Sequence, residues 1–105
     1  MTQQSITVFR SRVRDDVPPQ YDELSEALEA RAATFDGFVE FKMFHAADGE
    51  RLALVTFASD EAEAAWANDA GHRDAQRRGR EEFLTEYDVA VCSVQRRRVW
   101  RASDR

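Results

Sequence analysis

The chain of 105 residues has little of several features, and each shortage excludes a class of protein. Its single cysteine, Cys92, excludes a disulfide framework and a thiolate metal cluster within one chain. Its uncharged apolar runs are only a handful of residues long, far below the ~20 residues that span a membrane. The segment MTQQSITVFR lacks the basic and apolar regions of a secretory signal. We therefore expect a cytoplasmic protein with no membrane partner.

Lysine is almost absent too, and the remaining basic side chains are unevenly placed. Lys42 is the one lysine, and the net charge is −5. Residues 1–70 carry 6 basic and 14 acidic side chains, whereas residues 71–105 carry 9 and 6. An acidic chain of this kind is a poor partner for nucleic acid, which needs a basic footprint over a whole face. We interpret the short run Gln95-Arg96-Arg97-Arg98 as a solvated strand end and tail.

The composition is that of one globular domain. Hydrophobic residues make up 43% of the chain and charged residues 33%, which favours a packed core over disorder. A chain of this size buries about two-thirds of its surface on folding, enough for one core without disulfides. We expect a single domain over 1–105, with its core at about 5–95 and a basic tail at 96–105.

Alternating side chains predict four strands. The first covers 5–14, and the last covers 87–95, where Cys92 lies between the valines at 91 and 94 and is interpreted as a small core side chain. The segments 38–46 and 51–58 flank Asp48-Gly49, a strong signal for a two-residue hairpin, because primed turns need the positive φ that both residues tolerate.

Apolar positions three or four residues apart predict helices between these strands. One covers 19–34 and ends at Asp36-Gly37. Another is capped by Ser59, runs through Trp66 and falters at 68–71, after which a further helical segment covers 72–84.

The resulting order is β-α-β-β-α-β with a broken second helix. This order predicts an α+β, ferredoxin-like fold, in which the helices cover one face of an antiparallel sheet. The strands at 38–46 and 51–58 carry apolar residues on both faces. We therefore expect the uncovered face to pair with a second copy, giving a homodimer.

The segment after the helix break carries the best candidate site. At helical spacing, one stripe holds His72, Ala75, Gln76, Gly79 and Phe83. A plain core helix would use leucine at such positions, and a helical glycine costs about 1 kcal/mol relative to alanine. The close approach of another element, or of a ligand, would explain Gly79.

Several motifs together resemble the antibiotic biosynthesis monooxygenase (ABM) domain. They are S-D-E-A-x-x-A-W at 59–66, H-x-x-A-Q-x-x-G-R at 72–80 and a tyrosine-led last strand, with turns at 36–38 and 48–50, so that the resemblance covers about residues 6–94. It implies a dimeric α+β barrel. It also implies that O₂ oxidises a small aromatic or polyphenolic compound, quinol-like or anthrone-like, without metal, flavin or other cofactor.

The resemblance also suggests roles for single residues. His72 is the expected proton acceptor, and Trp66 would stack on a flat ring or donate its indole N–H. Gln76 and Tyr87 would hydrogen-bond a phenolic oxygen, while Arg10 would either form an ion pair at the dimer seam or steer an anionic substrate. Each has a structural alternative, such as a core anchor for Trp66, a capping role for His72, a solvent-facing Gln76 and simple packing for Tyr87.

Two other functions stay open. Haem degradation occurs on the same barrel, and those enzymes resemble this chain in the stretch Ala65-Trp66-Ala67-Asn68. They place asparagine where Arg10 stands, and their histidine lies further from the tryptophan than His72 does. The third possibility is a non-catalytic barrel that binds a small ligand or only assembles.

Overall fold

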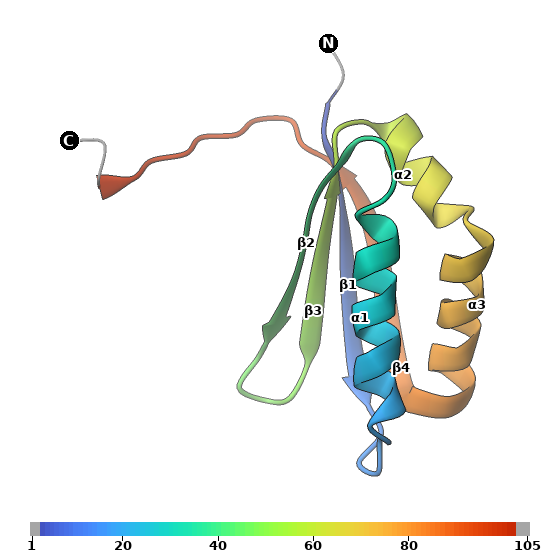
Figure 1. Cartoon of the computed structure of the whole chain (residues 1–105). Coiled ribbons are helices and arrows are strands. Elements are labelled where there is room, and N and C mark those ends of the chain that lie inside the picture. The colour runs from blue at the N-terminus through green and yellow to red at the C-terminus, as the bar shows by residue number, and fades with distance from the viewer. Residues whose placement is uncertain (1–2, 103–105) are drawn as a thin grey trace.

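The computed structural model describes residues 3–102. Along the chain lie β1 (Ser5–Val13), α1 (Gln20–Ala32), β2 (Phe38–His45), β3 (Arg51–Phe57), α2 (Asp60–Ala67), α3 (Ala70–Arg78), a π-helical turn η1 (Gly79–Phe83) and β4 (Leu84–Ser93). The strands form one antiparallel sheet in the order β2-β3-β1-β4. The helices lie on one face of this sheet (Figure 1). The predicted ferredoxin-like α+β fold is confirmed.

Two glycines define the turns around β2. Gly37 has φ +84°, and a Cβ there would lie 2.7 Å from the Cβ of Ala62, so glycine lets α2 pack close. The predicted two-residue hairpin is wrong, because Asp48 keeps a negative φ and only Gly49 is left-handed at +92°. Ala46 instead donates to the carbonyl of Glu50 at 2.8 Å, which closes a three-residue loop with a glycine bulge.

The second helix breaks where expected, but its later part differs from the prediction. The side chain of Asp69 caps α3, which begins at Ala70 rather than His72. The helix does not run on to Leu84, because η1 turns the chain and β4 starts at Leu84 instead of Tyr87. The early start follows from pairing, since Val13 and Arg12 at the end of β1 still face Leu84 and Glu86.

The core lies between the sheet and the helices, in two clusters. One contains Ala32, Val55, Phe57 and Trp66, and the other contains Tyr21, Phe83 and Leu84. The apolar stripe of α1 contributes to both, as its spacing predicted.

The other face of the sheet is open, as predicted. Strand alternation places Ile6, Val8, Leu52 and Leu54 there, all half-buried, next to the exposed Cys92. The interpretation of Cys92 as a core side chain is therefore wrong. Its neighbours on β4 belong to an edge strand that α1–α3 cover only in part.

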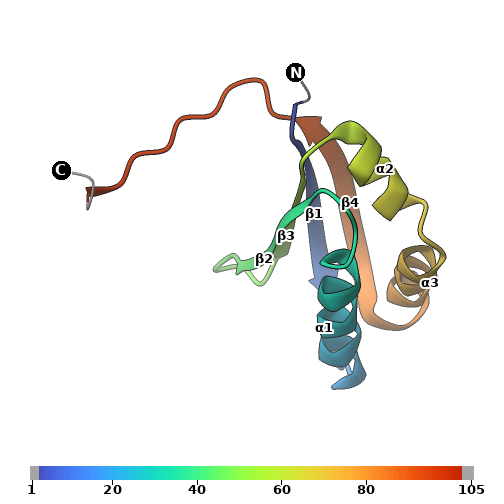
Figure 2. The same cartoon turned by 45° about the horizontal axis from the view of Figure 1, so that its top comes forward.

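After β4, residues 94–102 run away from the body on the side opposite the helices, as both views show (Figures 1 and 2). The predicted basic tail begins here, although residues 103–105 lie outside the described residues. Within residues 3–102, none of the helices has the length and apolar character needed to cross a bilayer.

Candidate functional site

A cavity of about 170 Å³ lies between the helices and the sheet. Its walls are mainly apolar side chains of β1–β4, α1 and α2, while α3 adds polar ones. The lining residues are Thr7, Phe9, Tyr21, Leu24, Ser25, Leu28, Phe41, Met43, Ala53, Val55, Glu63, Trp66, Ala67, His72, Ala75, Gln76, Gly79, Leu84, Tyr87, Val89 and Val91. Members of both core clusters are among them, so the cavity lies inside the core. Tyr87, Val89 and Val91 are 38%, 41% and 54% exposed, which places the mouth along β4.

Trp66 and His72 meet in this cavity. Their rings stack with centroids 4.0 Å apart and planes 11° from parallel. Trp66 is only 3% exposed, and the ring of Phe35 packs edge-on against it at 5.3 Å. The indole is therefore both a core anchor, as the structural alternative proposed, and part of the cavity wall.

The break between α2 and α3 makes this stacking possible. Asn68 donates its side-chain amide to the carbonyl of Ala64 at 2.9 Å, which ends α2. Asp69 then accepts from the backbone N–H of His72 at 2.9 Å and begins α3. The chain thus turns within two residues and brings His72 back over Trp66.

Arg31 of α1 holds this turn in place. Its guanidinium donates to both carboxylate oxygens of Asp69, at 2.6 and 2.9 Å. The hydrogen bond from Arg31 lowers the pKa of Asp69 to about 2, helped by the backbone N–H of His72. Asp69 is therefore a fixed anion at neutral pH, and it ties the first turn of α3 to α1.

The hydrogen bonds of His72 determine its protonation. Its Nδ1 lies 3.0 Å from the carbonyl oxygen of Trp66. A carbonyl can only accept, so Nδ1 carries the proton and Nε2 of the neutral ring bears the lone pair. Burial lowers the pKa of His72 below its usual value, which outweighs the opposing effects of Trp66 and Asp69. His72 is therefore a neutral base at physiological pH.

Three other predicted residues of the stripe, Ala75, Gln76 and Gly79, line the same cavity, whereas Phe83 belongs to the core cluster of Tyr21 and Leu84. Gln76 and Gly79 lie beyond His72 on α3 and at the start of η1. Tyr87 lies across from them on β4, where its hydroxyl accepts from Arg80 at 3.1 Å and its ring stacks on Phe9 at 5.5 Å. The structure thus brings Trp66, His72, Gln76 and Tyr87 together.

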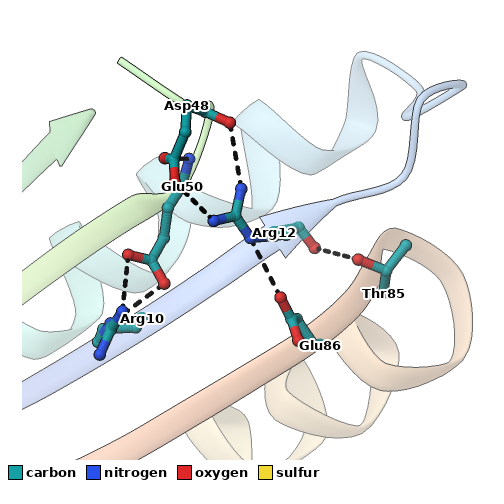
Figure 3. Close-up of polar contacts among 6 residues, drawn as sticks. All are labelled: Arg10, Arg12, Asp48, Glu50, Thr85 and Glu86. Carbon is teal, nitrogen blue, oxygen red and sulfur yellow. Dashed lines mark hydrogen bonds and ion pairs between the residues drawn. The ribbon is translucent and has the colours of Figure 1, made fainter. Parts of the chain in front are cut away.

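Arg10 is not part of this cavity. It lies on the open face, where its guanidinium donates to both carboxylate oxygens of Glu50 at 3.1 Å (Figure 3). Beside it, Arg12 pairs with Asp48 at 2.8 Å and with Glu86 at 3.1 Å. The sheet separates these ions from His72, so the predicted contact of Arg10 with a substrate finds no support. The ion pair that Arg10 forms lies within its own subunit.

Two cavity residues were missed in the sequence. Glu63 precedes Trp66 by one helical turn, and burial, together with the charge of Asp60, raises its pKa. The buried hydroxyl of Thr7 has no hydrogen-bond partner among residues 3–102. The spacing of Glu63 from Trp66, and of Thr7 from Phe9, could have placed both on the cavity side.

No three histidine, cysteine or acidic side chains come together as a metal site in the described part of the chain. No protein-family model matches the sequence. One relative is YqjZ of Bacillus subtilis (strain 168), an uncharacterised protein that is 28% identical over 93 residues, which cover 89% of this chain and 82% of YqjZ.

Solved structures resemble this chain over nearly its whole length. SnoaB from Streptomyces nogalater, a cofactor-independent oxygenase, superposes with a TM-score of 0.75 at 13% identity, covering 90% of this chain and 96% of SnoaB. A Nitrosomonas europaea protein, provisionally named an antibiotic biosynthesis monooxygenase, gives 0.76 at 11% identity over 90% and 93%. At such identities the likeness shows the fold: this chain has the fold of the antibiotic biosynthesis monooxygenases, as the motifs predicted.

Proposed function

We propose that the protein is a cofactor-independent monooxygenase that oxidises a small phenol-like or quinol-like aromatic compound with O₂. The observation that carries this proposal is the neutral imidazole of His72, stacked on Trp66 inside an apolar cavity. The fold shared with SnoaB supports the same class of reaction.

The cavity supplies what such a reaction needs from a protein. Triplet O₂ reacts poorly with closed-shell molecules, but an electron-rich phenolate can donate a single electron to it. Nε2 of His72 would remove the phenolic proton, and the apolar walls would exclude water from the anion. Where the oxidised position is a ring CH₂ group, one oxygen atom of O₂ enters the product as C=O. The other oxygen atom leaves as water with the two hydrogens of the CH₂ group.

Trp66 and Gln76 would hold the substrate for this step. The indole is fixed by Phe35 and His72, so a flat ring finds a rigid wall beside it. The amide of Gln76 and the hydroxyl of Tyr87 line the same space and can hydrogen-bond a ring oxygen. Glu63 is a second titratable group within reach of the cavity.

The size of the cavity limits the substrate. A cavity of ~150 Å³ lined by aliphatic and aromatic residues holds benzene. At about 170 Å³, this one suits a compound of one or two rings. A three-ring, anthrone-like compound would require the walls to move apart.

Haem does not fit the same space. Its macrocycle of four pyrroles is far larger than the ring compounds that a cavity of about 170 Å³ accepts. The imidazole of His72 also lies flat against Trp66 rather than facing an open slot. A haem-degrading activity is therefore not part of the proposal.

We also infer that the protein is a homodimer. The open face of the sheet carries half-buried Ile6, Val8, Leu52 and Leu54, and Phe44 is 41% exposed beside them. A continuous apolar sheet face of this kind is typical of an interface. A second copy, stacking face to face, would cover it with its own matching surface.

Oxygen uptake tests the proposed reaction. We expect uptake with a panel of one-ring and two-ring hydroquinones and naphthols, undiminished by a metal chelator. His72→Ala should lower the rate about 10²-fold, the usual effect of losing a general base. Arg73→Ala, next in the chain but exposed, is the matched control and should leave the rate unchanged. Parent-like uptake by His72→Ala would show that the base is assigned wrongly.

Silence with the whole panel would favour the non-catalytic alternative, a barrel that only binds a small ligand. Titration with haemin provides a separate check. A Soret shift in the parent that is lost in His72→Ala would contradict the argument from cavity size.

A further inference from the structure

Two polar side chains of the cavity have no partner in the described part of the chain. The hydroxyl of Thr7, on β1, is buried and has no hydrogen-bond partner among residues 3–102. The carboxylate of Glu63, on α2, is partly buried and accepts no hydrogen bond or ion pair from the same residues. Both side chains line the cavity. A polar group that the fold shields from water without a partner costs stability, so a ligand is the natural partner for both.

The register of the sheet and the start of α2 place these two groups at the same end of the cavity. Asp60, the first residue of α2, accepts a hydrogen bond from the hydroxyl of Ser93, the last residue of β4, at 3.4 Å. From there α2 continues toward α3 (Figure 2). Glu63 is about 4.5 Å further along this helix, and Val91 is about 7 Å back along β4. Because Val91 pairs with Thr7, both polar groups lie at the end of the cavity beside Val91.

The other end of the cavity offers a hydrogen-bond donor. Tyr87 lies four residues before Val91 on β4, about 13 Å away. Arg80 donates to the hydroxyl oxygen of Tyr87 at 3.1 Å, so the hydroxyl proton stays available to a ligand. The cavity thus has an acceptor end at Glu63 and a donor end at Tyr87.

The charge of the acceptor end restricts what can bind there. None of the described residues that line the cavity is a lysine or an arginine, and His72 is neutral. The charge that acts on Glu63 is the like charge of Asp60. An anionic group would therefore be repelled at this end, whereas a hydroxyl or amino group can donate to the carboxylate.

We propose that Glu63 and Thr7 bind a hydrogen-bond donor of the substrate, at the end of the ring system remote from Tyr87. The inference rests on the proposed function for the aromatic ring and narrows the substrate class. The substrate carries an oxygen at one end and a hydroxyl or amino group at the other, and aromatic carboxylates are rejected.

Binding without O₂ tests this pair independently of turnover. The probes are four naphthalenes: a diol with hydroxyl groups at opposite ends, the matching aminonaphthol, the monomethyl ether of the diol and the matching hydroxynaphthoate. Anaerobic calorimetry at about pH 8 keeps a partly exposed glutamate ionised. The diol and the aminonaphthol should each bind about tenfold or more tightly than the ether and the naphthoate.

Two variants remove the acceptors one at a time. Glu63→Gln and Thr7→Val keep the shape of each side chain, and each should reduce the preference for the diol and the aminonaphthol about three- to tenfold. Glu63→Gln should also remove the disadvantage of the naphthoate relative to the ether. Glu61→Gln is the matched control, because Glu61 is exposed on the same helix and does not line the cavity. It should bind all four probes as the parent does.

Thermal unfolding without ligand distinguishes binding from a structural role. Because the described fold gives neither group a partner, Glu63→Gln and Thr7→Val should each have the Tm of the parent or a higher one. A clearly lower Tm in either variant would show that the side chain serves the fold, and would overturn its assignment to the ligand.

Three binding results would overturn the proposal in distinguishable ways. If the parent binds the ether as tightly as the diol and the aminonaphthol, the cavity has no acceptor end, and the proposed reaction is still judged by its own uptake assay. If the parent binds none of the four compounds, this inference and the proposed function fail together. If Glu63→Gln and Thr7→Val both keep the full preference, another group recognises the donor.

Discussion

At Gly79, the residue type that would best stabilise the fold differs from the one that leaves most space in the cavity. It is buried at the start of η1, with φ −55° and ψ −48°, a conformation open to any residue. A Cβ at this position would meet only the side chain of Leu84, with 3.4 Å to its Cδ1 and 3.8 Å to its Cγ. These are ordinary contact distances, so neither backbone nor packing requires glycine. Stability alone would favour alanine by about 0.5–1 kcal/mol.

We expect Gly79→Ala to stabilise the protein and to impair its reaction. The added methyl group would lie beside Leu84 in the cavity wall, where it takes space from the substrate. One extra methyl group in a close-fitting pocket changes discrimination by about 10- to 200-fold. Urea unfolding should therefore give a free energy of unfolding about 0.5–1 kcal/mol above that of the parent, while kcat/KM for O₂ uptake falls about tenfold or more.

The reverse change one turn earlier, on α3, is the matched control. Ala75→Gly removes a methyl group from the cavity wall, so it should cost about 1 kcal/mol of stability and admit larger substrates. If Gly79→Ala instead destabilises the protein, the packing around η1 is tighter than the contact to Leu84 indicates. If the Gly79→Ala protein is more stable and has the kcat/KM of the parent, the substrate does not reach the cavity wall at Gly79.

Two more predictions concern the stacked pair. Trp66→Phe should raise KM more than it lowers kcat if the indole stacks on the substrate, whereas a stability loss of roughly 1–3 kcal/mol with unchanged kinetics would make it a core residue only. For His72, the pKa is lowered in the folded state, so the unfolded chain binds the proton first as the pH falls. Stability should be complete above about pH 6.5 and decrease below it, as urea midpoints can show, and His72→Gln should flatten this dependence.

Local sequence patterns predicted the fold because the signals for helices, strands and turns were consistent with one another along the chain. The helix break at 68–71 followed from Asn and Asp, whose side chains compete for backbone groups, and they do so at Asn68 and Asp69. Helical spacing then placed His72, Gln76 and Gly79 on one inward stripe, which lines the cavity. When the residues of a candidate site lie on a single helix, the helical period of the sequence is enough to predict that they share one face.

Other features depend on pairing between distant segments. The start of β4 at Leu84 is set by Val13 on β1, and nothing within 84–86 signals it. The exposure of Cys92 depends on which face of β4 the helices cover. Arg10 is the opposite case. The alternation of β1 places Arg10 on the face of Ile6 and Val8, opposite to Thr7 and Phe9. The sequence pattern alone could therefore have predicted that Arg10 lies away from the cavity.

The two faces of β4 take part in different features: one lines the candidate site, and the other belongs to the face proposed to form the dimer. Tyr87, Val89 and Val91 point toward the cavity, while Ala90 and Cys92 between and beyond them lie on the open face. A second copy on the open face would therefore leave the mouth of the cavity free. The ion pairs of Arg10 and Arg12 occupy the other end of that face and already have partners, so burying them gains little. The apolar end, where Ile6 pairs with Cys92, is then the part of the face where association releases most free energy.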